Sequence, residues 1–179
     1  GEYRYRRLVS SAPLPALLGL CGLPVDDTWT WNQVLVFNLG FDRKGKRDVH
    51  WLYVPSRERV FYRVGFYDNI LGSDRMSLYV EVGFPRDAEV DVAATRARVL
   101  ADLRAEGLVE DHRLVAEHSV LMNPAYVHLT SRSMAEARRL REQLAARGVH
   151  SIGRYGGWTY CSIEDNLVEA RALVGSFAP

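Results

Sequence analysis

VLVFNLGF, at residues 34–41, is the first of four strand-like runs that decide the fold of this chain. The other three are VHWLYV at 49–54, VFYRVGFY at 60–67 and SLYVEV at 77–82. All four are rich in the β-branched and aromatic residues that strands favour. The connectors at 42–48 and 55–59 are too short for crossover helices, so neighbouring strands are predicted to run antiparallel, as a meander.

Helical patterns flank these runs. A short helix after Ser11 carries apolar residues at helical spacing up to Cys21, and a longer one is predicted over 91–106. Two strands, at 114–121 and 125–129, are separated by a proline. They are followed by a helix that a capping box at 133–136 opens, a short strand at 149–152 and a last helix capped by Ser162. The pattern predicts an α+β fold with an antiparallel or mixed sheet of about six strands and helices grouped on one side.

Composition narrows the class of protein. A chain of 179 residues with 47% hydrophobic and 25% charged residues is typical of a globular domain with one well-buried core. A net charge of +1 gives no electrostatic reason to expect nucleic acid. The apolar runs are too short to span a membrane, and two cysteines far apart in sequence, Cys21 and Cys161, suit a reducing, cytoplasmic location.

Several familiar sites are excluded by spacing. No two glycines lie two residues apart, so the dinucleotide-binding fingerprint G-x-G-x-x-G is absent. A near match to a phosphate-binding loop starts at Gly40 but ends in Arg47 where Ser or Thr is needed, and we interpret it as a hairpin turn. The histidines and cysteines have no metal-ligand spacing, so no metal site is predicted.

The most informative stretch is GVHSIGRYGGWTYCSIEDNL at residues 148–167, which has the pattern of a strand, a glycine-rich loop and a helix start. A helix N-terminus attracts anionic or electron-rich groups, and Arg154 can add a contact to phosphate. Tyr155, Trp158 and Tyr160 can line a flat ring system. The alternative is a loop leading into a helix whose aromatic side chains fill a core, and the residues alone leave both open.

The run from Gly153 to Tyr160, followed by IEDNL at 163–167, resembles the C-terminal flavin-contacting motif of the amine-oxidase-like and UDP-galactopyranose-mutase-like flavoproteins. Residues 10–18 resemble the passage between the flavin domain and the substrate domain of these proteins. The resemblance implies noncovalent FAD. It also implies cofactor contacts from eight residues, which are Gly153, Arg154, Tyr155, Gly156, Trp158, Asp165, Asn166 and Leu167. By this resemblance, Gly153 and Arg154 would lie near the flavin pyrophosphate, and residues 165–167 near the ribityl chain and the pyrimidine edge.

The resemblance also divides the chain. Residues 1–130 are expected to form a substrate domain, and residues 131–179 the C-terminal flavin-contact segment. The N-terminal dinucleotide-binding domain, which lies upstream in this family, is expected to be absent from this chain and to be its partner. The isolated chain, which begins at Gly1 without Met, is then expected to be inactive and to hold flavin weakly or not at all.

A second set of residues is predicted to contact an organic small-molecule substrate. Trp51 and Tyr53 alternate on one strand, and Tyr62, Arg63 and Tyr67 belong to the next. Aromatic rings beside an arginine suit a ligand with a polar or anionic group, whereas ordinary cross-strand packing is the alternative. No catalytic acid, base or nucleophile is apparent in the sequence. A flavin would itself carry the hydride chemistry.

The functional prediction is therefore a fragment of an FAD-dependent oxidoreductase of the amine-oxidase or protoporphyrinogen-oxidase type. Two alternatives remain, a mutase-like isomerase that uses reduced flavin and a non-catalytic binding or interaction module. The flavin-contacting face at residues 153–160 is expected to be exposed and apolar once its partner domain is removed, which allows self-association through that face.

Overall fold

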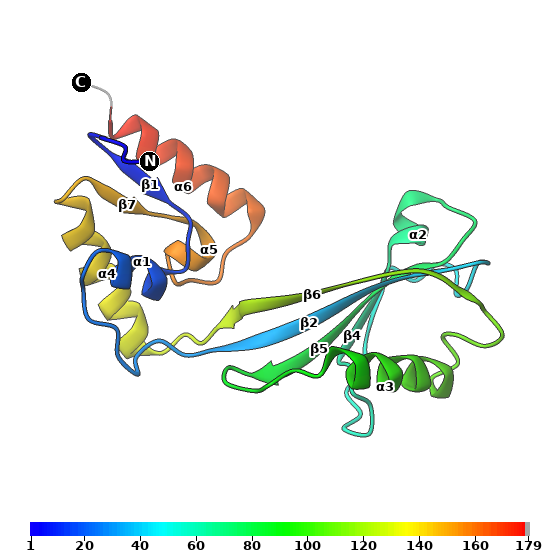
Figure 1. Cartoon of the computed structure of the whole chain (residues 1–179). Helices are drawn as coiled ribbons and strands as arrows, with labels where there is room; N and C mark the ends of the chain where they lie inside the picture. The colour runs from blue at the N-terminus through cyan, green and yellow to red at the C-terminus, as the bar shows by residue number, and fades with distance from the viewer. Residues whose placement is uncertain (178–179) are drawn as a thin grey trace. The chain divides into compact units, whose positions relative to one another are not determined.

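The computed structural model describes residues 1–177. The chain divides into two compact units, each described here by itself (Figure 1). The sheet unit comprises Asn32–Ala125, and the terminal unit comprises Gly1–Trp31 together with Tyr126–Pro179. The N-terminal residues thus belong to the same compact unit as the C-terminal segment. The predicted functional division instead cut the chain once, between residues 130 and 131. That functional division stays a prediction.

A five-stranded antiparallel sheet forms the sheet unit, in the order β3-β4-β5-β2-β6. The α+β class is confirmed, but a meander is formed by β3, β4 and β5 alone. The first strand, β2, lies between β5 and β6 and does not pair with β3. The strands are β2 (Trp31–Phe41), β3 (Trp51–Tyr53), β4 (Arg63–Phe66), β5 (Ser77–Pro85) and β6 (Leu114–Val127).

One face of this sheet is covered by helix α3 (Val92–Ala105), which begins at the capping side chain of Asp91. Alternate strand residues point towards it, because successive side chains of a strand face opposite ways. They form a closed core with Val99 and Leu103 of the helix. The strand residues in this core include Leu35, Phe37, Leu39, Val64, Phe66, Leu78, Val80 and Val82.

Three local predictions in the sheet unit are wrong. The two strands predicted at 114–121 and 125–129 form one strand, β6, which runs through the cis peptide bond between Asn123 and Pro124. The strand predicted to extend to Tyr67 ends at Phe66, where helix α2 (Tyr67–Leu71) begins. The segment predicted as a hairpin turn after Gly40 does not join paired strands; it is a loop whose Lys44 ammonium contacts the Asp68 carboxylate at 2.6 Å.

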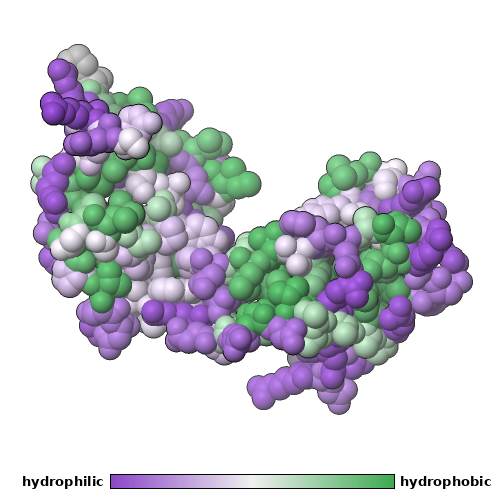
Figure 2. All heavy atoms as spheres, in the orientation of Figure 1, coloured by the Kyte–Doolittle hydropathy of each residue, from purple (hydrophilic) through white to green (hydrophobic). Residues whose placement is uncertain are grey.

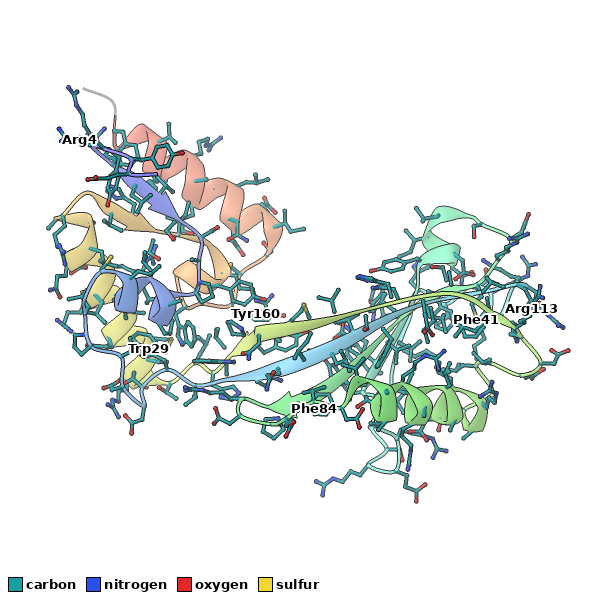
Figure 3. All side chains as sticks on the ribbon, viewed as in Figure 1. Arg4, Trp29, Phe41, Phe84, Arg113 and Tyr160 are labelled. Carbon is teal, nitrogen blue, oxygen red and sulfur yellow. The ribbon has the colours of Figure 1, made fainter. Side chains whose placement is uncertain are left out.

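Two short parallel strands, β1 (Leu8–Ser10) and β7 (Val149–Ser151), form the sheet of the terminal unit. Helices α1 (Leu14–Leu20), α4 (Ser131–Ala145), α5 (Gly153–Gly156) and α6 (Ile163–Gly175) complete it. Its core joins leucines of α1 and α4 with two indoles, those of Trp29 and Trp158. Figure 3 labels Trp29, and also Tyr160 on the segment between α5 and α6.

Helix starts in the terminal unit were predicted with mixed success. The last helix is capped by Ser162 as expected, and Asp165 returns the contact in a capping box. The capping box of α4 lies three residues before the predicted one, because Thr130 and Ser133 bond each other's main-chain amides. Residues 153–156 form the short helix α5 in place of the predicted loop. None of the described helices combines the length and hydrophobicity needed to cross a membrane.

Candidate functional site

The sheet face opposite α3, called the open face here, collects aromatic and charged side chains by register. Trp51 lies opposite Gly65, which in turn lies opposite Tyr79. Two residues further along the strands, Tyr53 lies opposite Arg63, and Arg63 lies opposite Glu81. Directly opposite residues share a face of an antiparallel sheet, so the two rows lie side by side on one surface.

A tyrosine ring covers the glycine of the first row. A Cβ atom added to Gly65 would lie 1.8 Å from Cε1 of Tyr79, so the ring rests directly on the backbone of β4. The ring of Tyr79 also lies 5.0 Å from that of Tyr67, between centroids, and 5.6 Å from the guanidinium of Arg63. Contacts on three sides therefore fix the position of Tyr79.

The second row contains an ion pair whose carboxylate is buried and whose guanidinium is partly exposed. Glu81, with its side chain only 6% exposed, accepts hydrogen bonds at one oxygen from Nε and Nη2 of Arg63, the first at 3.0 Å. Its other oxygen accepts from the hydroxyl of Tyr62 at 2.5 Å. The carboxylate thus neutralises Arg63 inside the protein. The open face has no net charge at the position where the sequence suggested a binding group for anions.

The aromatic side chains around this pair are accessible to solvent. Trp51 is 56% exposed, Tyr53 65% and Tyr67 41%. Burial raises the pKa of Tyr79, and the positive charge of Arg63 only partly opposes this effect. The phenol of Tyr79 therefore stays protonated at neutral pH and can donate a hydrogen bond. Together these groups make a surface of aromatic rings and hydroxyl groups, on which the charge of Arg63 is neutralised by Glu81.

The structure brings all five predicted substrate residues, Trp51, Tyr53, Tyr62, Arg63 and Tyr67, to this region. Their role in binding stays a prediction. Two residues were missed by sequence reasoning, Tyr79 and Glu81, although the alternation of β5 could have indicated them: they lie between buried Leu78, Val80 and Val82. Phe61, two residues before Arg63, would share its face by strict strand alternation, but it lies before the start of β4 and is buried in the core.

In the terminal unit, the turn at Gly153 holds a carboxylate of this chain itself. Gly153 has a φ of 81°, which glycine adopts without strain. Its N–H donates to Oε2 of Glu169 on α6 at 2.8 Å, and Nη2 of Arg141 donates to Oε1 of the same carboxylate at 2.5 Å. A phosphate at this amide would meet Glu169, so the geometry does not favour a pyrophosphate contact from Gly153.

Arg154 lies between two aromatic rings. Its guanidinium carbon is 5.3 Å from the ring centroid of Tyr126 and 4.7 Å from that of Tyr160. Stacking on two rings orients the guanidinium through cation–π attraction and leaves its edge able to donate hydrogen bonds. Arg154 thus stays a candidate for contact with a bound group.

The middle of the motif is part of the core. A Cβ atom at Gly156 would lie 2.9 Å from Oγ of Ser151, so this glycine is required for close packing. Trp158 is 1% exposed and its ring meets those of Trp29 and Trp31 edge to face. The expectation that the whole 153–160 face is exposed is therefore wrong at its centre, although Tyr160 is 73% exposed. Tyr155 is partly buried.

The start of α6 uses its polar side chains for its own cap. The carboxylate of Asp165 accepts from the amide and hydroxyl of Ser162, which lowers the pKa of Asp165. Asn166 donates to the carbonyl of Ser162 at 2.8 Å. The amides of Ile163 and Glu164, in the first turn, have no acceptor within the helix.

These observations decide how the residues fit the expected FAD. The first turn of α6 carries Glu164 and Asp165, and negative side chains at this end oppose a second anion. The free first-turn amides fit the neutral carbonyl oxygens of a flavin pyrimidine edge. Leu167 is 68% exposed on the same helix and offers apolar contact. The segment therefore suits the uncharged ring end of the cofactor better than its phosphates. Among the described residues, no three His, Cys, Asp or Glu side chains gather as a metal site would require.

Comparison with known proteins identifies the fold. No protein-family model and no curated protein matches the sequence. Among solved structures, reduced UDP-galactopyranose mutase matches 89% of this chain and 38% of its own, with a TM-score of 0.77 at 20% identity. A protein from Exiguobacterium sp. 255-15 assigned as a protoporphyrinogen oxidase matches 95% of this chain and 40% of its own, with a TM-score of 0.74 at 15% identity.

A third match is the CLA-producing fatty acid isomerase from P. acnes. The match covers 97% of this chain and 42% of the isomerase chain, with a TM-score of 0.61 at 17% identity. The chain thus spans about two fifths of the length of each of these proteins. At these identities the likeness establishes the fold, which is flavoprotein-like. It confirms the resemblance noted from the sequence, since the mutase and the oxidase are two of the enzyme classes named there.

Proposed function

We propose that this chain supplies the substrate-binding sheet and part of the flavin site of an FAD-dependent oxidoreductase of the amine-oxidase or protoporphyrinogen-oxidase type. The observation that carries the proposal is the open face, on which exposed aromatic rings surround an arginine neutralised by Glu81. Such a surface binds flat organic molecules by apolar contact and orients them through a few hydroxyl groups. FAD, when bound, would supply the hydride-accepting chemistry.

The flavin contacts that we propose from this chain come from the terminal unit. The first-turn amides of α6 would hold the pyrimidine edge, with Arg154 and Tyr160 beside it and Leu167 against the ring. The apolar residues Ile163, Leu167 and Val174 are 82%, 68% and 66% exposed. An N-terminal FAD-binding domain, supplied by a longer protein, is the partner that we propose for this helix face. Both cysteines are free, which supports the cytoplasmic location that we also propose.

The substrate that the open face favours is an uncharged, flat molecule. An anionic substrate would need a free cation, and the guanidinium of Arg63 is already bonded to Glu81. Displacing that bond would leave a buried carboxylate unpaired, which costs several kcal/mol in typical proteins, roughly 3–5. Neutral rings avoid this cost and gain contact area on Trp51 and Tyr53.

Two probes of similar shape test this preference: benzamide is neutral, and benzoate is anionic. We expect benzamide at millimolar concentration to shift the NMR signals of Trp51 and Tyr53, and benzoate to shift them less. Trp51→Ala should abolish the shifts at Tyr53. The control Val174→Ala, at an exposed apolar residue of the terminal unit, should leave them intact. Stronger binding of benzoate than of benzamide would contradict the proposed substrate class.

The flavin part of the proposal is tested separately in the full-length protein. We expect that protein to be yellow as purified, with the absorption spectrum of bound flavin. A flavin-free protein that does not take up added FAD would rule out the enzyme proposal and leave a binding module. A mutase-like isomerase is the second candidate, which the likeness to reduced UDP-galactopyranose mutase favours. The two differ in turnover, because an isomerase consumes no electron acceptor.

A further inference from the structure

The outer edge of the five-stranded sheet is formed by β6, a strand of 14 residues that ends the strand order. Nearly every residue of β6 is exposed or partly exposed, and Ala125 is its one buried residue. The exposed side chains include Val115 at 50%, Val120 at 43% and Leu121 at 42%. Figure 2 shows hydrophobic atoms on the surface of the sheet unit along which β6 runs. Residues 114–122 of this edge strand thus present apolar side chains and, on the side away from β2, a backbone edge with no neighbouring strand in the sheet order.

The lysine and proline residues that often protect a sheet edge are missing from residues 114–122. Proteins blunt exposed edges with lysine, proline, bulges or a covering element, since unpaired N–H and C=O groups invite another strand. The stretch LVAEHSVLM at residues 114–122 contains no lysine, arginine, proline or glycine. Its one acidic side chain, Glu117, is already held by Nε of Arg96 on α3 at 2.6 Å. The edge is therefore both long and nearly uncharged.

The sequence of this edge is complementary to itself in the antiparallel direction. If two copies pair about a two-fold axis through His118, apolar residues face apolar residues and no like charges meet. The facing pairs are Leu114 with Met122, Val115 with Leu121, Ala116 with Val120, Glu117 with Ser119, and His118 with His118. We propose that a second copy of this chain pairs with β6 in this register, which joins two sheets into one.

Neighbouring registers are less favourable. A symmetric pairing must place residues of the same sheet face opposite each other, so the axis moves in steps of one residue along the strand. Centring on Glu117 places two carboxylates face to face, which is destabilising. Centring on Ser119 places Glu117 opposite Leu121 and takes the acid out of water without a new partner. The axis at His118 avoids both penalties.

The expected association is weak and reversible. One strand pair buries less surface than a standard protein interface, so a Kd of about 10–100 µM is expected. The self-association that was expected at residues 153–160 involves a different surface. The strand-pairing proposal therefore needs tests that separate β6 from the terminal unit, whose exposed apolar residues include Tyr160 and Leu167.

Cysteine crosslinking measures the register directly. The native cysteines are first removed by Cys21→Ser and Cys161→Ser, and diamide serves as the oxidant. Opposite Cα atoms in an antiparallel pair lie about 4.5–5.5 Å apart, within disulfide range. His118→Cys should therefore give a covalent dimer. Val120→Cys alone should not, since its counterpart lies four residues along the strand, roughly 13 Å away. An equal mixture of Ala116→Cys and Val120→Cys should crosslink as a heterodimer.

Sedimentation of the whole chain measures the affinity and its dependence on the edge. Val120→Lys, an edge lysine, should weaken dimerisation at least tenfold, whereas Leu167→Lys on α6 should leave it unchanged. Loss of the dimer with Leu167→Lys but not with Val120→Lys would overturn the proposal and assign association to α6. A chain that stays monomeric at several hundred µM, far above the expected Kd of about 10–100 µM, would also overturn it, as would equal crosslinking of His118→Cys and Val120→Cys.

Discussion

Replacing Gly65 by alanine tests how the open face is built. The added methyl group would lie 1.8 Å from Cε1 of Tyr79 and 2.0 Å from Cζ, far inside contact distance. The backbone of β4 is fixed by pairing with strands on both sides, so the tyrosine ring must move. It would leave the ring of Tyr67 and the guanidinium of Arg63, which now lie 5.0 Å and 5.6 Å away.

The expected magnitude follows from these contacts. Losing the aromatic pair costs about 0.5–1.5 kcal/mol, and losing an exposed cation–π contact about 0.5–1 kcal/mol. Alanine in a strand is favoured over glycine by roughly 0.5–1 kcal/mol, which offsets part of the loss. Gly65→Ala should therefore destabilise the chain by about 1 kcal/mol, and by up to about 2 kcal/mol if the ring finds no strain-free position.

A double-mutant cycle with Tyr79→Ala isolates the clash. Once the Tyr79 ring is removed, Gly65→Ala should stabilise the chain by roughly 0.5–1 kcal/mol, since only the backbone term remains. The coupling energy from urea unfolding should then be about 2 kcal/mol. If Gly65→Ala has the same effect with and without the tyrosine, the ring does not rest on this glycine and the account of the open face is wrong.

Three further outcomes are expected. Trp158→Ala should cost about 3–5 kcal/mol of stability and reduce the near-ultraviolet circular dichroism, because it empties a core site shared with other indoles. Ser162→Ala should cost about 1 kcal/mol by removing a helix cap. The hydrogen bonds that the Asp165 carboxylate accepts from Ser162 hold its folded-state pKa below the ordinary value of 3.8, so their contribution is present above pH 3.8 and lost as the pH falls through the folded-state pKa; helicity against pH, compared with Asp165→Asn, measures it. The folded-state pKa of Tyr79 lies above its ordinary value of 10.0. The stability that its neutral phenol contributes is therefore present below pH 10.0 and lost as the pH rises through the folded-state pKa. The phenolate absorbance of the chain, compared with that of Tyr79→Phe, follows this titration.

Strand content was predictable because the apolar patterns of the sheet unit are strong. Leu35, Phe37 and Leu39 alternate along β2, and the structure uses this alternation for the core. The strand order was not predictable, because a short connector restricts direction but does not require two strands to pair. The loop after Phe41 is short, yet β2 pairs with β5 and β6.

The candidate site, too, was predictable only in part. Alternation placed Trp51 and Tyr53 on one face, and that was enough to find them. The neutralisation of Arg63 depends on Glu81, which lies on another strand and meets it only through register. In the motif near the C-terminus, the residue types alone left open whether Trp158 lines a ligand or fills a core. Burial among other rings depends on residues distant in sequence, such as Trp29.

The pairing of Leu8 with Val149 has a consequence for the order in which the chain becomes structured. Contacts of the sheet unit join residues within a continuous segment, so that segment can fold as soon as it leaves the ribosome. The terminal unit cannot close until β7 has also been synthesised, because β1 pairs with β7 and the whole sheet unit lies between them in sequence. Until then, the leucines of α1 lack the core that they share with Leu140 and Leu144 of α4 and with Trp158.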